Sequence, residues 1–229
     1  MKTMILAAGR GQRMRPLTDH TPKPLLTVGG KPLIVWHIEK LVAAGFSDIV
    51  INCAWLGQQL QDALGDGGRY GARLSWSPED PPLETAGGIA RALPLLGSDP
   101  FLVVNGDVWC DWDFREALKC RETLQQDNAA AWLLLVNNPA HHRQGDFSLD
   151  TQGRVHDEHA TGRRLTFSGI GIYRPELFTA LSGQEPAPLA PLLRQAMRLG
   201  KVSGCLHQGR WFDIGTPERL QQLDTQLTF

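Results

Sequence analysis

Short apolar runs alternate with helical patterns along the first two thirds of the chain, and this alternation constrains the fold more than any other feature. Residues 4–8 are continuously apolar, which is typical of a strand buried on both faces of a parallel sheet. Pro32 suits the first turn of a helix, and Gly45 suits its end. The β-α-β-α order predicts a mostly parallel sheet with helices on both faces. Further strands are expected at Asp48–Cys53, 74–77, Phe101–Asn105 and 130–136, and helices at 32–44, 56–64, 86–95 and 113–125.

The pattern changes after Asn137, where antiparallel strands are indicated. Residues 146–149 and Val155 flank a turn-forming run, TQG, which predicts a β-hairpin. The chain has 229 residues, a length that single α/β domains reach, and it contains no repeat and no long linker. We therefore predict one domain, residues 1–229. Later strands are expected at 164–173 and 202–206, and later helices at 188–199 and 216–227.

Composition and charge exclude several classes of protein. The net charge of −1 and the pI of about 6.6 argue against a general nucleic-acid binder. The four cysteines form no C-x-x-C pair, which argues against a disulfide framework or a zinc site and favours buried free thiols. No apolar run approaches the ~20 residues of a membrane helix, and the run that follows Lys2 is too short for a signal peptide. We therefore expect a cytoplasmic protein that binds neither nucleic acid nor a membrane.

A basic loop with two glycines follows the first expected strand. It lies where ligands bind in parallel α/β sheets, outside the carboxyl ends of the strands. Gly9 and Gly11 let the backbone approach a ligand closely, and charged side chains can donate hydrogen bonds to phosphate oxygens. We expect a polyphosphate here, with a solvated basic loop as the alternative. The cations of this segment are Arg10, Arg13, Arg15 and Lys23.

Two common phosphate motifs do not fit this loop. The P-loop pattern G-x-x-x-x-G-K-[ST] is missing from the sequence. The dinucleotide pattern G-x-G-x-x-G begins at Gly9, but Met14 occupies the third glycine position. The second expected strand ends at Cys53, with no acid there to hold a ribose. A dinucleotide site is therefore not expected.

Residues 6–25, LAAGRGQRMRPLTDHTPKPL, resemble the signature of the sugar-1-phosphate nucleotidylyltransferases. NGD at 105–107 resembles the second motif of that family, WFDIGTPE at 211–218 the third, and ETAGGI at 84–89 the segment that contacts the base. Ala86 departs from the pattern, since glycine is expected there.

The resemblance covers essentially the whole chain, and it implies the fold. That fold is a single-domain, Rossmann-like (GT-A-like) α/β nucleotidyltransferase, with a mixed, mostly parallel central sheet flanked by helices and a small β-rich sugar-binding subregion. Residues 1–136 would then mainly bind the nucleotide, and residues 137–229 mainly the sugar phosphate.

The implied reaction is attack by a sugar-1-phosphate oxygen on the α-phosphorus of a nucleoside triphosphate, with loss of pyrophosphate. Positioning and charge neutralisation carry most of such a reaction. The implied catalytic residues are Lys23 and Arg15. The implied Mg²⁺ ligands are Asp107 and Asp213, each of which could, without the resemblance, be an ordinary turn residue. The implied nucleotide-binding residues are Leu6, Ala8, Gly9, Gly11, Gln12, Arg13, Lys23, Gly87 and Gly88.

Five further stretches resemble one branch of the family, the enzymes that transfer UMP from UTP to N-acetylmuramic acid 1-phosphate in cell-wall (peptidoglycan) recycling. This likeness implies those two substrates and Mg²⁺ as cofactor, and we expect a monomer. The alternatives are another sugar-1-phosphate thymidylyl- or guanylyltransferase, a phosphocholine cytidylyltransferase, and a nucleotide-sensing subunit without catalysis. The stretches are INCAWLGQQL, PLLGSDPFLVVNGDVW, NPAHHRQGDFSL, LTFSGIGIY and LAPLLRQAMRLGKVSG.

The sugar phosphate is expected near Asn105 and Asp146. By the resemblance, Asn105 hydrogen-bonds the sugar or ribose and Asp146 reads sugar hydroxyls, with an Asp at a hairpin edge as the alternative. Muramic acid carries a lactyl carboxylate that glucosamine lacks, so its site should contain a cation. The candidates for that cation are His142, Arg143 and Arg210, and Trp211 is a candidate for stacking near the substrate.

Overall fold

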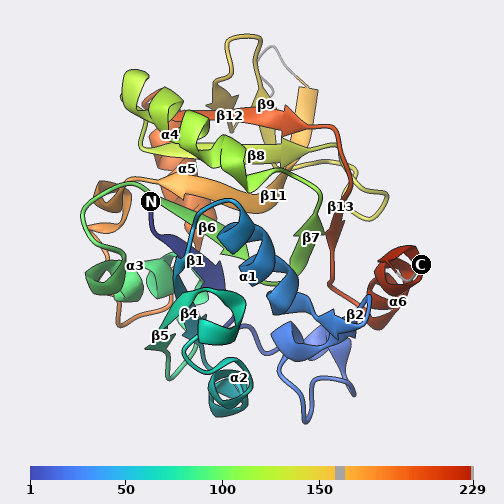
Figure 1. Ribbon diagram of the computed structural model, residues 1–229. Helices are drawn as coiled ribbons and strands as arrows, with labels where there is room; N and C mark the ends of the chain where they lie inside the picture. The colour runs from blue at the N-terminus through green and yellow to red at the C-terminus, as the bar shows by residue number, and fades with distance from the viewer. Residues whose placement is uncertain (158–162, 228–229) are drawn as a thin grey trace.

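The computed structural model describes residues 1–157 and 163–227, which contain a nine-stranded sheet flanked by helices (Figure 1). Its strands are β1 (Thr3–Leu6), β4 (Asp48–Cys53), β5 (Arg73–Pro78), β6 (Phe101–Asn105), β8 (Ala131–Val136), β9 (Phe147–Leu149), β10 (Val155–His156), β11 (Arg163–Tyr173) and β12 (Val202–His207). The parallel part has the order β6-β1-β4-β5, and β11 joins it antiparallel to β6. β8 pairs with β11 and with β12, and the β9–β10 hairpin pairs with the start of β11.

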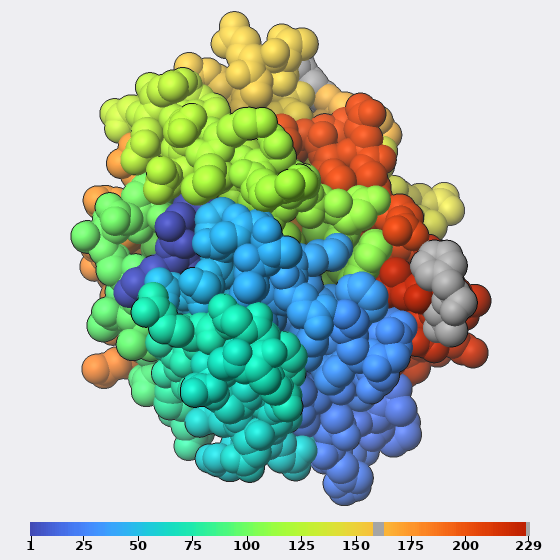
Figure 2. All heavy atoms as spheres, in the orientation of Figure 1, coloured from blue at the N-terminus to red at the C-terminus, as the bar shows by residue number. Residues whose placement is uncertain are grey.

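Helices cover both faces of this sheet. α1 (Leu33–Ala43), α2 (Gly57–Leu64) and α4 (Ala117–Gln126) pack in one apolar cluster, and Figure 2 shows the first two covering that face. α3 (Glu84–Leu96) and α5 (Leu189–Arg198) pack in a second cluster on the opposite face. In β1, Ile5 faces the first cluster and Met4 the second, which explains why this strand is apolar at successive positions.

A third apolar cluster joins the chain's first loop to its last helix. It contains Met14, Trp109 and Leu223, the last from α6 (Pro217–Leu227). Two small ribbons lie beside it: β2 (Thr27–Val28) with β3 (Lys31–Pro32), and β7 (Val108–Cys110) with β13 (Trp211–Asp213). The single-turn 3-10 helices are η1 (Gln12–Met14), η2 (Lys23–Leu25), η3 (Gly68–Tyr70), η4 (Phe114–Glu116) and η5 (Pro175–Phe178).

The fold predicted from the sequence is confirmed, with local differences. The central strands are parallel, helices lie on both faces, and the hairpin after Asn137 is present. Asp113 caps η4 through a bond from the Arg115 N–H, so α4 begins four residues later than expected. Neither ribbon was predicted. Among the four cysteines, which are free, Cys205 is exposed, so the expectation of buried thiols is wrong at that position.

No helix among the described residues is long and apolar enough to span a membrane.

Candidate active site

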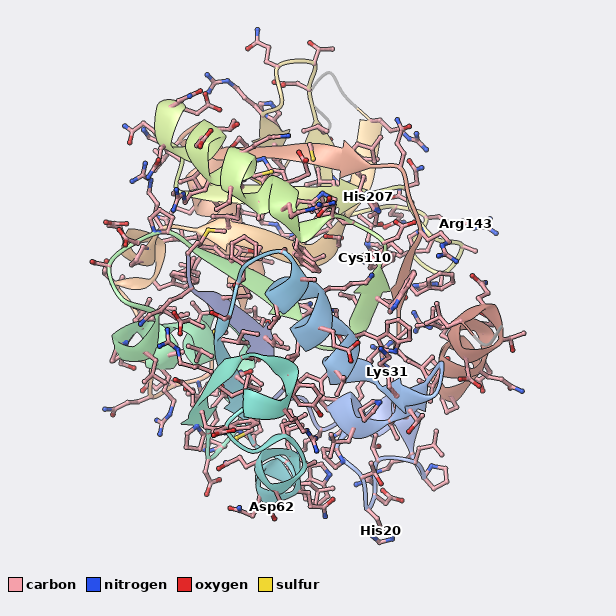
Figure 3. All side chains as sticks on the ribbon, in the orientation of Figure 1. His20, Lys31, Asp62, Cys110, Arg143 and His207 are labelled. Carbon is pink, nitrogen blue, oxygen red and sulfur yellow. The ribbon has the colours of Figure 1, made fainter. Side chains whose placement is uncertain are left out.

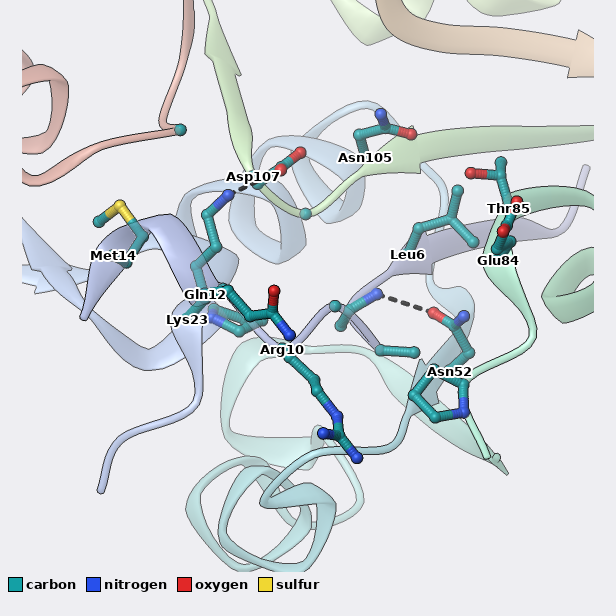
Figure 4. Close-up of a pocket in the computed structure, with 18 of the residues that line it drawn as sticks. Leu6, Arg10, Gln12, Met14, Lys23, Asn52, Glu84, Thr85, Asn105 and Asp107 are labelled. Atoms are coloured by element: carbon teal, nitrogen blue, oxygen red, sulfur yellow. Dashed lines mark hydrogen bonds and ion pairs between the residues drawn. The ribbon is translucent and has the colours of Figure 1, made fainter. Parts of the chain in front are cut away.

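A cavity of about 840 Å³ opens at the carboxyl ends of β1, β4 and β6 (Figure 4). The loop that follows β1 forms its floor, and Asn52, Glu79 and the start of α3 close one side. Parallel sheets bind ligands at this edge, because the loops that leave neighbouring strands meet there. The cavity is lined by residues 6–14, Lys23, Pro24, Asn52, Glu79, Pro82, Glu84, Thr85, 105–107 and Gly215.

Gly11 gives this loop its shape. Its φ of 62° lies in the left-handed region, and a Cβ atom here would stand 2.9 Å from Thr18 Cγ2. Thr18 Oγ1 donates to the Gly11 carbonyl at 2.8 Å, and the Met14 N–H donates to the same oxygen at 2.8 Å. The loop is therefore fixed from outside, while a Cβ added at Gly9 would meet nothing within 4 Å. The backbone there is open to a ligand.

Lys23 and Asp107 meet at the centre of the site. Lys23 Nζ lies 2.7 Å from Asp107 Oδ2, although Lys23 is only 8% exposed (Figure 4). η2 places the lysine, and the end of β6 places the aspartate. His37 in α1 fixes the next residue, since its Nε2 donates to the Val108 carbonyl at 2.7 Å. Burial lowers the pKa of His37 to about 4, so the ring is neutral in this contact near pH 7.

A second cavity, of about 380 Å³, adjoins the first. Arg13, Asn105 and Asp107 line both, so the two form one continuous site with these residues at the junction. Below we call them the larger and the smaller cavity. The smaller cavity is otherwise lined by Val108, Pro139, His141, His142, 166–169, Trp211 and Asp213.

Asp213 stands in the smaller cavity beside basic side chains. Arg219 Nη1 of α6 donates to its Oδ2, and His141 Nε2 lies 3.0 Å from its Oδ1. That second oxygen is buried and makes no well-aligned hydrogen bond. Gly215 leaves the space that these groups need, because a Cβ there would lie 2.5 Å from Arg219 Nη2 and 3.3 Å from Arg13 Nη2. Positive charge is therefore concentrated beside Asp213.

The carboxylates of Asp107 and Asp213 are compatible with Mg²⁺. Both line the smaller cavity, and they come from the two neighbouring segments β6–β7 and β13. In the described part of the chain, no group of three His, Cys, Asp or Glu side chains is arranged to hold a metal ion. Mg²⁺ does not need such a group, since it usually takes one or two carboxylates together with substrate phosphates and water. The under-bonded Asp213 Oδ1 offers one such oxygen.

Most residues expected from the sequence lie in this site. The larger cavity contains Leu6, Ala8, Gly9, Gly11, Gln12, Arg13, Lys23, Asn105 and Asp107, and the smaller contains Asp213, His142 and Trp211. Six expected residues lie outside both linings: Arg15, Gly87, Gly88, Arg143, Asp146 and Arg210.

The arginines outside the cavities have other partners. Arg15 turns to Asp19, 3.0 Å away, with 66% of its side chain exposed. Arg143 is exposed and projects from the edge of the molecule (Figure 3). The guanidinium of Arg210 lies 5.2 Å from the centroid of the Trp109 ring. Of the three candidate cations for a lactyl carboxylate, only His142 lines a cavity.

Asp146 and the two glycines have structural surroundings. Asp146 Oδ1 lies 2.9 Å from His142 Nε2, and its Oδ2 accepts from the Phe167 N–H, so Asp146 orients a residue of the smaller cavity. A Cβ on Gly87 would stand 2.6 Å from the Glu185 carbonyl oxygen, and one on Gly88 would stand 2.5 Å from Glu79 Oε1. Glycine at these two positions therefore allows α3 to pack closely against Glu185 and Glu79.

Four polar side chains of the site were not predicted from the sequence: Asn52, Glu79, Arg219, and His141 as a partner of Asp213. Asn52 is the one polar residue in the inner part of the strand DIVINC, and a buried amide in an apolar strand is a signal that could have been used. Arg219 gives no comparable signal, because it looks like any arginine on an amphipathic helix.

The site combines a loop that turns at Gly11, the buried Lys23 and the carboxylates of Asp107 and Asp213. The sequence profile of the nucleotidyl transferase family matches residues 2–228. The chain belongs to this family. It is therefore a nucleotidyltransferase, and the resemblance noted from residues 6–25 is confirmed.

This nucleotidyl transferase is similar in sequence to several known proteins. It is 58% identical over 223 residues to N-acetylmuramate alpha-1-phosphate uridylyltransferase of Neisseria meningitidis serogroup B, a match that covers 97% of this chain and 96% of that protein. It is 30% identical over 224 residues to the catalytic subunit beta of mannose-1-phosphate guanylyltransferase of Xenopus tropicalis. That match covers 95% of this chain but 62% of the subunit.

Solved structures confirm the nucleotidyl transferase fold. A Bacillus anthracis protein described as a glucose-1-phosphate thymidylyltransferase superimposes with a TM-score of 0.85 at 23% identity, covering 99% of this chain and 95% of that one. HddC of Yersinia pseudotuberculosis, solved with GMP-PN, superimposes with a TM-score of 0.78 at 20% identity, covering 99% of each chain.

Proposed function

We propose that this nucleotidyl transferase transfers UMP from UTP to N-acetylmuramic acid 1-phosphate, giving UDP-N-acetylmuramic acid and pyrophosphate. The observation that carries the proposal is the 58% identity to the Neisseria enzyme along nearly the whole of both chains. Two adjoining cavities that share lining residues support it, because the reaction brings two substrates together. UTP belongs in the larger cavity, with its base toward the start of α3 and its phosphates on the loop after β1. The sugar phosphate belongs in the smaller cavity.

In the proposed reaction, a phosphate oxygen of the sugar forms a bond to the α-phosphorus of UTP. The bond from that phosphorus to the bridging oxygen breaks, and pyrophosphate leaves. Charge accumulates around the α-phosphorus, so cations fixed there stabilise the transition state more than the ground state. Lys23 is suited to this role because it is buried, held by η2 and turned to the junction of the cavities. Its present partner, Asp107, would release it to the phosphates.

Arg13 lines both cavities, and we assign it to the phosphates of the two substrates. Arg15 would reach a phosphate only after its guanidinium leaves Asp19. Asp107 and Asp213 would hold Mg²⁺, which when bound neutralises phosphate charge and orients the triphosphate. Asn105, at the junction, would hydrogen-bond the sugar or ribose.

On the sugar side, we assign His142 to the lactyl carboxylate. It lines the smaller cavity, and Asp146, 2.9 Å away, holds its ring. Asp146 itself would contribute through this contact or through a sugar hydroxyl. We further propose that residues 1–136 mainly bind nucleotide and 137–229 mainly sugar phosphate, that the protein acts as a cytoplasmic monomer, and that its product returns to cell-wall synthesis.

The proposal is tested by supplying Mg²⁺ and N-acetylmuramic acid 1-phosphate with each of UTP, CTP, GTP, ATP and dTTP in turn. Pyrophosphate release is followed, and the nucleotide sugar is identified by mass. We expect release with UTP well above the others and a product with the mass of UDP-N-acetylmuramic acid. A clear preference for GTP, as in the mannose relatives' names, would contradict the proposal.

A further inference from the structure

Three polar contacts connect two segments that line the larger cavity, the loop after β1 and the start of α3. Asn52 Oδ1 accepts from the Ala7 N–H at 2.7 Å, at the start of the loop after β1 (Figure 4). Asn52 Nδ2 donates to Glu79 Oε1 at 2.7 Å. Glu79 Oε2 accepts from the Leu83 N–H at 2.8 Å, directly before α3. We call this chain of contacts, from Ala7 through Asn52 and Glu79 to Leu83, the amide bridge.

The amide bridge is buried and tightly enclosed. Asn52 is 2% exposed and Glu79 is 5% exposed. Gly88 of α3 packs directly over it, because a Cβ there would stand 2.5 Å from Glu79 Oε1 and 2.9 Å from Asn52 Nδ2. Buried polar groups are costly unless each is paired, so these side chains have little freedom to change partners.

The bridge ends beside a residue with an unusual backbone conformation. Glu84, the first residue of α3, lines the larger cavity and has a φ of 57°. A residue other than glycine adopts this left-handed region at an energetic cost and needs support from its surroundings. The bond from Glu79 to the N–H of Leu83, the preceding residue, supplies such support.

We propose that Asn52 and Glu79 are positioning residues that hold the loop at Ala7 and the start of α3 in the relative geometry that binds the nucleoside triphosphate. This inference rests on the proposed function, which places UTP in the larger cavity. Asn52 and Glu79 act through the backbone at Ala7 and Leu83. The bridge holds the phosphate-binding loop and the base-binding segment together, so its loss weakens nucleotide binding more than the chemical step.

Hydrogen-bond polarity makes the proposal testable. The bridge has a backbone N–H donor at each end, at Ala7 and at Leu83. All three contacts can be hydrogen bonds only if one of the two side chains between them is an amide and the other a carboxylate. In Glu79→Gln, two N–H donors must face each other at one of the three contacts of the bridge, whichever way the two amides are turned. In Asn52→Asp, two carboxylate oxygens face each other. In the double variant, which combines Asn52→Asp with Glu79→Gln, the new aspartate accepts at both ends, and the new glutamine donates to it and accepts from Leu83. Every group is then paired again.

The experiment measures UTP binding by calorimetry, KM and kcat for UTP, and the thermal unfolding midpoint in the parent, both single variants and the double. Each single variant should raise the KM and the Kd for UTP about tenfold, the effect of one mispaired buried polar group, while kcat changes by less than about threefold. The double variant should return to within about threefold of the parent in each constant. Asp48→Asn, the same kind of change at the half-buried start of β4, should match the parent.

Other results would overturn the proposal. Losses that add in the double variant would mean that Glu79 contacts the nucleotide directly, since moving its charge to position 52 could not then restore binding. Parent-like constants in Glu79→Gln would also exclude the bridge. If the single variants unfold, Gly88→Ala provides the test: it keeps every polar group but crowds the bridge, and parent-like UTP binding would exclude the proposal.

The outcome is separable from that of the proposed function. If the parent prefers another nucleoside triphosphate, the proposed function is wrong, and the same four proteins are compared by calorimetry with the nucleotide that the parent does bind. If the parent uses UTP but the double variant is not restored, the bridge alone is wrong.

Discussion

The two cavities are held by different kinds of interaction. On the larger cavity's wall, buried residues make hydrogen bonds to the backbone: Asn52 to Ala7, Glu79 to Leu83 and Thr18 to Gly11. On the smaller cavity's wall, contacts between acidic and basic side chains are prominent, and these side chains are partly exposed. His142 and Asp146, for example, are 40% and 36% exposed.

The two kinds of interaction give the two cavity walls different rigidity and different sensitivity to salt. Buried backbone contacts fix a geometry before any ligand arrives, and they are insensitive to salt. Exposed pairs contribute little to stability, are screened by salt, and can exchange partners with a charged ligand. We infer that the larger cavity is preorganised for the part of the substrate shared across the family, and that the smaller cavity holds the charges that recognise one particular sugar.

The largest effect is expected at the junction of the walls. Lys23→Ala removes the buried cation assigned to the transition state, and turnover should fall about 10²–10³-fold, as for other fixed donors of this kind. Steady-state kinetics with circular dichroism would check it. Lys31→Ala, which removes a lysine that pairs with Glu39 outside both cavities, should keep parent turnover. Near-normal turnover in folded Lys23→Ala would exclude the lysine from the mechanism.

The next effect concerns the metal. Asp213→Asn removes a charge from the proposed Mg²⁺ ligand, and the Mg²⁺ concentration for half-maximal rate should rise by about tenfold or more, the range found even for residues that only support a metal ligand. Asp107→Asn should act in the same direction. A magnesium titration of the rate measures this, with the surface variant Asp62→Asn as control. If Asp213→Asn titrates like the parent, the assignment of Asp213 is wrong.

Stability should depend on pH through His37, which supports the wall at Val108. Burial lowers the pKa of His37 to about 4, while the unfolded chain titrates near 6.5. Between these values the unfolded state binds the extra proton, so this contribution is present above pH 6.5 and is lost as the pH falls toward 4. From pH 7.5 to pH 5 it amounts to about 2 kcal/mol.

Urea unfolding at the two pH values would measure this loss. In His37→Gln, which does not titrate in this range, the change in unfolding free energy between pH 7.5 and pH 5 should be smaller than in the parent by about 2 kcal/mol. Equal pH dependence in both proteins would show that His37 is not the responsible group.

The smallest expected effect is on the choice of sugar, and it separates the candidate cations for binding the lactyl carboxylate. His142→Ala should reduce the preference for N-acetylmuramic acid 1-phosphate over N-acetylglucosamine 1-phosphate about tenfold, the value of one charge-assisted hydrogen bond. Arg143→Ala and Arg210→Ala should leave it unchanged, because those side chains lie outside the cavity. Ratios of kcat/KM would decide. A loss in Arg143→Ala alone would mean that the loop closes on the substrate.

The fold could be predicted because its signals are local. An apolar run such as DIVINC indicates a strand, and a glycine that follows a helical pattern, such as Gly45, indicates where the helix ends. Neither signal depends on distant parts of the chain. The β7–β13 ribbon was missed because it joins Val108 to Asp213, two short segments that become strands only through contact with each other. The fourth expected helix was placed from residue 113, but Asp113 caps a 3-10 turn, and local signals do not separate that turn from an α-helix.

The site could be predicted only in part, for a related reason. Residues 6–14 and Lys23 lie together because one loop carries them. Where a long side chain points depends on distant partners: Arg15 turns to Asp19, Arg210 lies over Trp109, and Arg219 reaches Asp213 from the last helix. Sequence spacing carries no information about those directions.

The most direct test of the account compares two sugars in the unmodified protein. With UTP and Mg²⁺ held constant, kcat/KM is measured for N-acetylmuramic acid 1-phosphate and for N-acetylglucosamine 1-phosphate. We expect a preference for the muramic sugar of about tenfold to hundredfold, the contribution of a cation in the smaller cavity to binding one carboxylate. Equal use of the two sugars would contradict the proposed function, because the charges of the smaller cavity would then have no part in choosing the substrate.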